Sequence, residues 1–158
     1  MTTQDLETAF FLVGPQRELL RATLNRIIPA DGAFPGAGDL GVVSYVDTVV
    51  ARSAELRRLF ARGLTQIDIT IQELHAQGFM DLSEHQKDAV LRRVEANNSE
   101  FFSALLTHTY SAYYSNPLII RQLGQDPRPP QPRGHELEPL DLSLLDRVRR
   151  RRPLYRPA

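Results

Sequence analysis

The sequence predicts an all-α fold: a bundle of about five helices followed by an extended, proline-rich C-terminal tail. Between Gly36 and Asn116 there is no proline, and the apolar residues recur every three to four positions, as they do along helices. Seven of the 11 prolines lie in the last 34 residues instead. We therefore expect a helical bundle domain over residues 1–124 and a proline- and arginine-rich tail over residues 125–158.

The composition is typical of a single globular domain and excludes several classes of function. Hydrophobic residues make up 42% and charged residues 24% of the 158 residues. The 19 basic and 19 acidic side chains cancel, so no global field attracts nucleic acid or an anionic membrane. Without cysteine there is no disulfide, no thiolate metal site and no cysteine nucleophile.

The first ten residues and the hydropathy of the chain bear on its location. The N-terminal segment carries acidic residues and no basic n-region, and its apolar run is too short for a signal peptide. No apolar window approaches the length of a membrane-spanning helix, so we expect no direct membrane insertion. The expected location is the cytoplasm, or the periplasm if the chain is exported together with a partner.

Turn and capping residues divide the first half of the bundle. Pro15 suits the first turn of a helix, and Pro29 ends it, which predicts a helix over residues 15–28. Three glycines and two prolines make residues 29–38 a loop. Asp39 is the expected N-cap of a second helix with a buried valine stripe, and a third helix is expected over about residues 54–77.

The second half of the bundle has stronger local signals. Gly63 inside the third helix costs about 1 kcal/mol relative to alanine, which predicts a close helix crossing there. Ser83 and Gln86 form a capping box that opens a fourth helix. Residues 97–99 end that helix and cap an aromatic-rich fifth helix, which Pro117 ends or extends into a short turn.

The tail is rich in large apolar residues, which is unusual for a disordered segment. Its prolines favour an extended polyproline conformation, and Asp141 is expected to cap a short helix that bears Leu142, Leu145 and Val148. This pattern suits a segment that wraps over a surface. That surface is either the bundle itself or another protein.

Catalytic and metal-binding patterns are weak in this sequence. The four histidines show no ligand spacing of the kind found in zinc sites, and no phosphate-binding loop or nucleophile elbow is present. Asp31, Asp39 and Asp47 are the remaining candidates for acid–base chemistry. Asp47 lies beside the valine stripe and is a candidate for partial burial, with Arg26 as a candidate partner. A structural ion pair or a helix-capping role is favoured over catalysis.

The basic run Arg149–Arg152 leaves an alternative open: a stand-alone module that binds nucleic acid or protein through this run. The neutral net charge and the lack of a basic aromatic surface nearby argue against nucleic acid. A solvated or partner-facing run is the preferred interpretation.

Several segments resemble the gluconate 2-dehydrogenase subunit 3 family over about residues 15–124. The most specific is Arg26-Ile27-Ile28-Pro29-Ala30-Asp31, at the end of the first helix. The others follow it in the family's order: Pro35–Ala37, Gly41–Val43, Tyr45–Asp47, Gly63–Leu64, Asp68, Phe79, Leu82–Gln86, Phe101–Phe102 and Tyr113–Pro117.

The resemblance implies a small accessory subunit that does no chemistry and binds no cofactor. Its expected partner is a large FAD-dependent dehydrogenase of the glucose-methanol-choline type, often accompanied by a cytochrome c subunit. In that family the small subunit supports the folding, stability or export of the large one. We expect the partner contacts on three parts of the chain, the loop, the aromatic helix and the tail: Ile28, Pro29, Asp31, Tyr110, Tyr113, Tyr114, Pro129, Pro130, Leu142, Leu145 and Tyr155.

Overall fold

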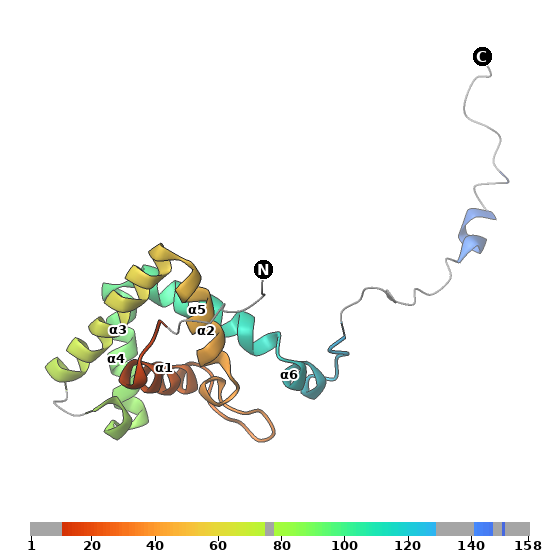
Figure 1. The fold of residues 1–158 in the computed structure, drawn as a ribbon. Helices are drawn as coiled ribbons and strands as arrows, with labels where there is room; N and C mark the ends of the chain where they lie inside the picture. The colour runs from red at the N-terminus through yellow and green to blue at the C-terminus, as the bar shows by residue number, and fades with distance from the viewer. Residues whose placement is uncertain (1–10, 75–77, 129–140, 147–149, 151–158) are drawn as a thin grey trace, which may run out of the picture. The chain divides into compact units, whose positions relative to one another are not determined.

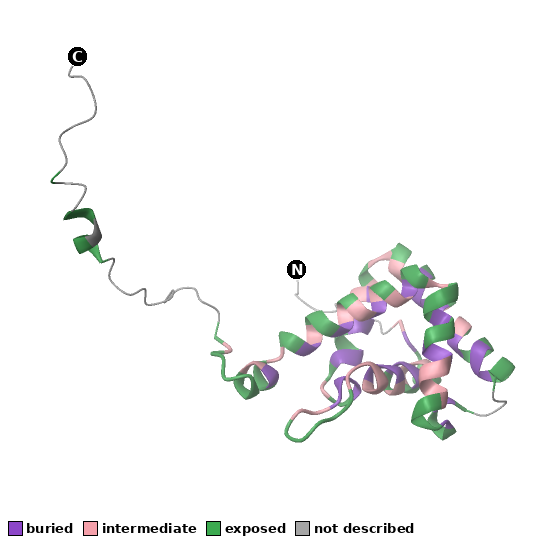
Figure 2. Cartoon of the chain, turned by 180° about the vertical axis from the view of Figure 1, so that it is seen from behind, coloured by how far each residue is buried: buried purple, intermediate pink, exposed green. Residues whose placement is uncertain are grey.

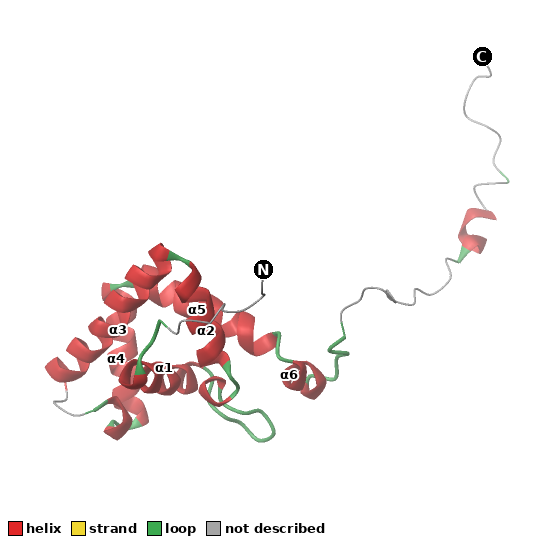
Figure 3. Ribbon diagram, viewed as in Figure 1, coloured by secondary structure: helices red, strands yellow, loops and turns green. Residues whose placement is uncertain are grey.

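The chain is all-α, which confirms the predicted fold class (Figures 1 and 3). The computed structural model describes residues 11–74, 78–128, 141–146 and 150. The chain divides into two units, Met1–Pro127 and Arg128–Ala158. The helices are α1 (Gly14–Ile27), α2 (Val42–Arg52), α3 (Ala54–Leu74), α4 (Glu84–Asn97), α5 (Ser99–Tyr114) and α6 (Pro117–Gln122), with 3-10 turns η1 (Ala37–Asp39), η2 (Phe79–Asp81) and η3 (Leu142–Leu145).

One hydrophobic core holds the bundle together. Its side chains come from the six α-helices of the described residues, and Figure 2 colours the buried positions of these helices purple. Phe60 and Phe101 are fully buried, and their rings meet edge to face with centroids 5.3 Å apart. Fully burying one such side chain contributes about 2–3 kcal/mol, so this contact between α3 and α5 is a main source of stability.

The predicted close crossing at Gly63 is confirmed. A Cβ at this position would overlap the ring of Phe101. Only glycine leaves space for that ring against the backbone of α3. The cost of a glycine inside the helix is thus offset by the packing of α5 on α3.

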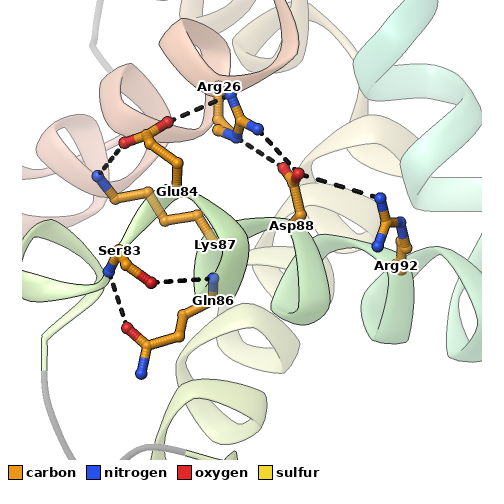
Figure 4. A network of polar contacts seen from close by, with 7 residues as sticks. All are labelled: Arg26, Ser83, Glu84, Gln86, Lys87, Asp88 and Arg92. Atoms are coloured by element: carbon orange, nitrogen blue, oxygen red, sulfur yellow. Dashed lines mark hydrogen bonds and ion pairs between the residues drawn. The ribbon is translucent and has the colours of Figure 1, made fainter.

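The predicted caps of α4 and α5 are confirmed as well. Ser83 accepts a hydrogen bond from the Gln86 backbone N–H at 3.3 Å, and the Ser83 N–H donates to Gln86 Oε1 at 2.8 Å (Figure 4). Asn98 caps α5 by accepting from the Phe101 N–H at 3.3 Å. These bonds satisfy N–H groups that a helix start would otherwise leave unpaired.

The prediction for the start of the second helix is wrong. Asp39 lies in η1, and α2 begins at Val42 after Gly41, whose φ of 79° is in the left-handed region that favours glycine. The Asp39 carboxylate pairs instead with side chains of α1. The third helix is described as far as Leu74, because residues 75–77 lie outside the described part of the chain.

In the second unit, Asp141 caps a short turn as predicted, with its carboxylate accepting from the Ser143 N–H at 3.0 Å. The turn is a 3-10 helix, and Val148 lies outside the described residues. Among the helices of the described residues, none combines the length and apolarity needed to cross a bilayer.

Candidate partner interface

The loop between α1 and α2 is a short hairpin that projects from the bundle (Figure 1). At its base the Ala37 N–H donates to the Ile28 carbonyl at 3.0 Å. Nearer the tip, Asp31 and Phe34 exchange two backbone hydrogen bonds of 2.9 Å each. Gly32 makes the turn with φ of 54°. The tip is therefore a defined backbone structure and not an irregular loop.

Side chains of α5 and α6 hold this hairpin against the bundle. The Tyr113 hydroxyl donates to the Pro35 carbonyl at 2.9 Å, and Gln122 Nε2 donates to the Ala33 carbonyl at 2.5 Å. Burial raises the pKa of Tyr113, so its hydroxyl remains a donor at neutral pH. The hairpin, the end of α5 and α6 form one connected platform.

The turn η1, which follows the hairpin, packs against α1. Asn25 Oδ1 accepts from the Gly38 N–H at 2.7 Å, and Asn25 Nδ2 donates to Asp39 at 3.0 Å. Arg21 donates to the same carboxylate at 2.5 and 3.0 Å, which holds the pKa of Asp39 below its usual value. A Cβ at Gly38 would overlap the Arg21 carbonyl oxygen, so this contact requires glycine.

An ion-pair network fixes the end of α1, where the hairpin begins, to α4 (Figure 4). Arg26 forms a bidentate pair with Asp88, with hydrogen bonds of 2.6 and 2.8 Å, and its Nη1 lies 3.2 Å from Glu84. The hydrogen bond from Arg26 holds the pKa of Asp88 below its usual value. Lys87 completes the network through Glu84 at 3.1 Å. Arg26 is thus a positioning residue for the hairpin.

The predicted pair between Arg26 and Asp47 is therefore wrong. Asp47 is fully buried and pairs with Arg17, whose Nη1 lies 2.5 Å from the carboxylate. The other carboxylate oxygen accepts the N–H groups of Phe11 at 2.9 Å and Leu12 at 3.0 Å. These bonds fasten the segment that precedes α1 to α2, which is a structural use of the carboxylate.

The residues expected to contact a partner in the bundle take two different roles. Ile28 is half-buried, and Pro29 and Asp31 are exposed on the hairpin. On α5, Tyr110 and Tyr114 are 44% and 52% exposed, with ring centroids 6.2 Å apart. Tyr113 is 3% exposed and supports the hairpin from within, so a docked protein would touch Tyr110 and Tyr114 instead.

In the tail, Leu142 and Leu145 are 51% and 43% exposed. Pro129, Pro130 and Tyr155 lie outside the described residues, as does the arginine run apart from Arg150, which is exposed. The tail contacts therefore stay predictions.

Two further residues contribute to this surface and were not predicted as contacts from the sequence. Tyr45 on α2 is 42% exposed and lies beside His108, with ring centroids 6.4 Å apart. Gln122, which supports the hairpin, acts across 89 residues of sequence. The helical period places Tyr45 one position away from the buried stripe, so its exposure could have been predicted from the sequence. No local sequence pattern indicates the partner of Gln122. In the described parts of the chain, no group of three or more histidine and acidic side chains is arranged to hold a metal ion.

The family model described as gluconate 2-dehydrogenase subunit 3 matches residues 15–126, well over half of the chain. No curated protein and no solved structure matches. The matched region begins in α1 and ends just after α6, so it contains the hairpin and every element that holds it. The chain belongs to the gluconate 2-dehydrogenase subunit 3 family.

Proposed function

We propose that this chain is a non-catalytic accessory subunit of a larger FAD-dependent dehydrogenase of the glucose-methanol-choline type. The observation that carries the proposal is the family match over the whole bundle, which suggests a small subunit of a dehydrogenase complex. The large subunit would hold the flavin and oxidise a sugar, a sugar acid or an alcohol. A cytochrome c subunit would accept the electrons in complexes that contain one.

The arrangement of charged groups supports a structural role. Asp47, the only buried carboxylate among the described residues, binds Arg17 and two backbone N–H groups, and Asp39 binds Arg21 and Asn25. Both are used to hold chain segments in place. A rigid hairpin with an exposed tip, next to exposed tyrosines, is instead suited to docking on another protein.

The test is co-expression of the tagged chain with the large flavoprotein subunit of the same host. We expect a yellow complex with flavin absorbance, and less soluble or less flavin-loaded large subunit when the small chain is omitted. A colourless eluate that contains this chain alone would contradict the proposal. So would a large subunit that folds, binds flavin and turns over equally well without it.

A further inference from the structure

Between α2 and α5 lies a surface groove that includes Tyr45 but none of the partner contacts predicted from the sequence. It has a volume of about 310 Å³ and lies between Leu40, Gly41 and Tyr45 on one side and Ser111, Ala112 and Ser115 on the other. Half-exposed Tyr45 forms one wall. The floor is made of small side chains on α5, which leaves room for a side chain from outside.

The lining of this groove is entirely uncharged. Three other grooves in the described part of the chain each contain a charged side chain: Arg62 on α3, Arg26 at the end of α1, and Arg92 on α4. The difference starts in the sequence, because residues 101–120 contain no Asp, Glu, Lys or Arg, although such residues make up 24% of the chain. Residues 40–46 are uncharged too.

This uncharged surface continues around α5. Ser111 and Ser115 lie one turn apart on the groove side, and Tyr114 lies next to them around the helix at 100° per residue. Beyond the helix end, Leu118 on α6 is 43% exposed. Depletion of charge, together with exposed tyrosines, characterises the core of a stable protein interface rather than its rim.

We infer that the α2–α5 groove receives an uncharged segment of the large dehydrogenase subunit, led by one aliphatic or aromatic side chain that packs on Tyr45. This inference rests on the proposed function, which supplies the occupant. The uncharged lining determines the chemistry of that segment, because a charged group that entered the groove would lose hydration and find no side chain of opposite charge. A second, independent anchor beside the hairpin would fix the orientation of the two subunits.

The inference is tested by placing a charge in the groove. Ser111→Lys keeps an exposed helical position but puts an ammonium group where the partner segment would sit. Ser103→Lys is the matched control, because Ser103 is also exposed on α5 and does not line the groove. Affinity is measured with the co-expressed, flavin-loaded large subunit, and helicity and thermal melting verify that each variant is folded.

We expect Ser111→Lys to weaken binding at least about 30-fold, the effect of losing an interface hot spot, whereas Ser103→Lys and Ser111→Ala bind as the wild type does. Tyr45→Ala, which removes one wall, should also weaken binding, and it serves as the second variant if Ser111→Lys fails to fold.

The possible outcomes separate this inference from the proposed function. If the wild-type chain does not bind the flavoprotein, both fail together. If the wild type binds and Ser111→Lys and Tyr45→Ala bind equally well, the groove inference is overturned and the proposed function stands. If Ser103→Lys weakens binding as much as Ser111→Lys does, the groove is not a specific binding site and the inference is overturned. A free chain that dimerises, and becomes monomeric with Ser111→Lys, would assign the groove to a second copy instead.

Discussion

At the scale of single residues, Asp47 shows how one buried carboxylate can organise a chain end. Its charge is balanced by Arg17, and its second oxygen accepts two backbone N–H groups from residues 35 and 36 positions earlier. The buried side chain of Leu12 is thereby held against the core. The carboxylate is satisfied by this chain alone, which explains a buried acid without invoking catalysis.

We predict that Asp47→Ala lowers the free energy of unfolding by about 3 kcal/mol, because Arg17 and the two N–H groups lose a buried acceptor. Asp47→Asn should cost less, since its amide oxygen can still accept the backbone bonds. Urea unfolding followed by circular dichroism measures both. Asp31→Asn, at the exposed hairpin tip, is the control and should change stability by less than about 0.5 kcal/mol. If Asp47→Ala were as stable as this control, Asp47 would not fasten the segment before α1.

At the scale of elements, local signals predicted the helices well and long-range pairings poorly. The capping box joins two residues that are three positions apart, and the close helix crossing depends on a glycine that has no side chain. Both features can be predicted from the local sequence. The partners of Arg26 and Arg17 lie 62 and 30 residues away. Either arginine could have satisfied Asp47 on charge alone, and only the packing of α1 on α2 and α4 decides between them.

The close crossing of α3 and α5 leads us to expect that replacing the helical glycine Gly63 by alanine destabilises the fold. On propensity alone, Gly63→Ala would stabilise α3 by about 1 kcal/mol. Because the added methyl group overlaps the Phe101 ring, we expect a net destabilisation of about 2 kcal/mol instead. A double-mutant cycle with Phe101→Leu should show that the two changes together cost less than their sum. Gly14→Ala, whose methyl group meets no atom within 4 Å, is the control; a stabilised Gly63→Ala would disprove the close crossing.

The ion-pair network between α1 and α4 makes the stability of the bundle sensitive to acid. The pKa of Asp88 in the folded chain lies below its ordinary value of 3.8, so the unfolded chain takes up the proton more readily. The stability from the Arg26 pair is therefore complete above about pH 4 and is lost as pH falls through the folded pKa. We predict that Asp88→Asn lowers the free energy of unfolding by about 1 kcal/mol at pH 7, and that this difference shrinks as the pH falls below about 4. Melting curves across this range test it, with Glu95→Gln on the exposed side of the same helix as control; a difference that does not vary with pH would contradict it.

At the scale of the whole molecule, the fold class could be predicted because proline placement and helical periodicity are global features of the sequence. The candidate interface is different. The hairpin, Tyr110 and Tyr114 were named from the sequence as partner contacts and stay predictions. The groove beside Tyr45 forms where α2 and α5 meet, and no local sequence pattern indicates that contact. The uncharged run over residues 101–120 is the one sequence feature that indicates an uncharged surface there, and hydrophobic periodicity does not detect it.

The division of the chain into two units leads to a prediction about the tail. Within the described residues, every buried hydrophobic side chain lies between Leu12 and Ile119, so the core that the structure describes ends before Pro127. A chain that ends at Pro127 should keep its helicity, and its melting temperature should stay within about 3 °C of the full-length value. A fall of more than about 8 °C would show that the tail belongs to the core of the bundle.

The same truncation separates the bundle from the tail in partner binding. If Leu142 and Leu145 are anchors, full-length Leu142→Ser/Leu145→Ser and the truncated chain should both lose affinity for the large subunit while the isolated bundle remains stable. Each half-exposed leucine buried in an interface contributes on the order of 1 kcal/mol, so the double variant should bind roughly 30-fold more weakly. Unchanged affinity in both variants would restrict the interface to the hairpin, the tyrosines and the groove, all of which lie within the residues that the family model matches.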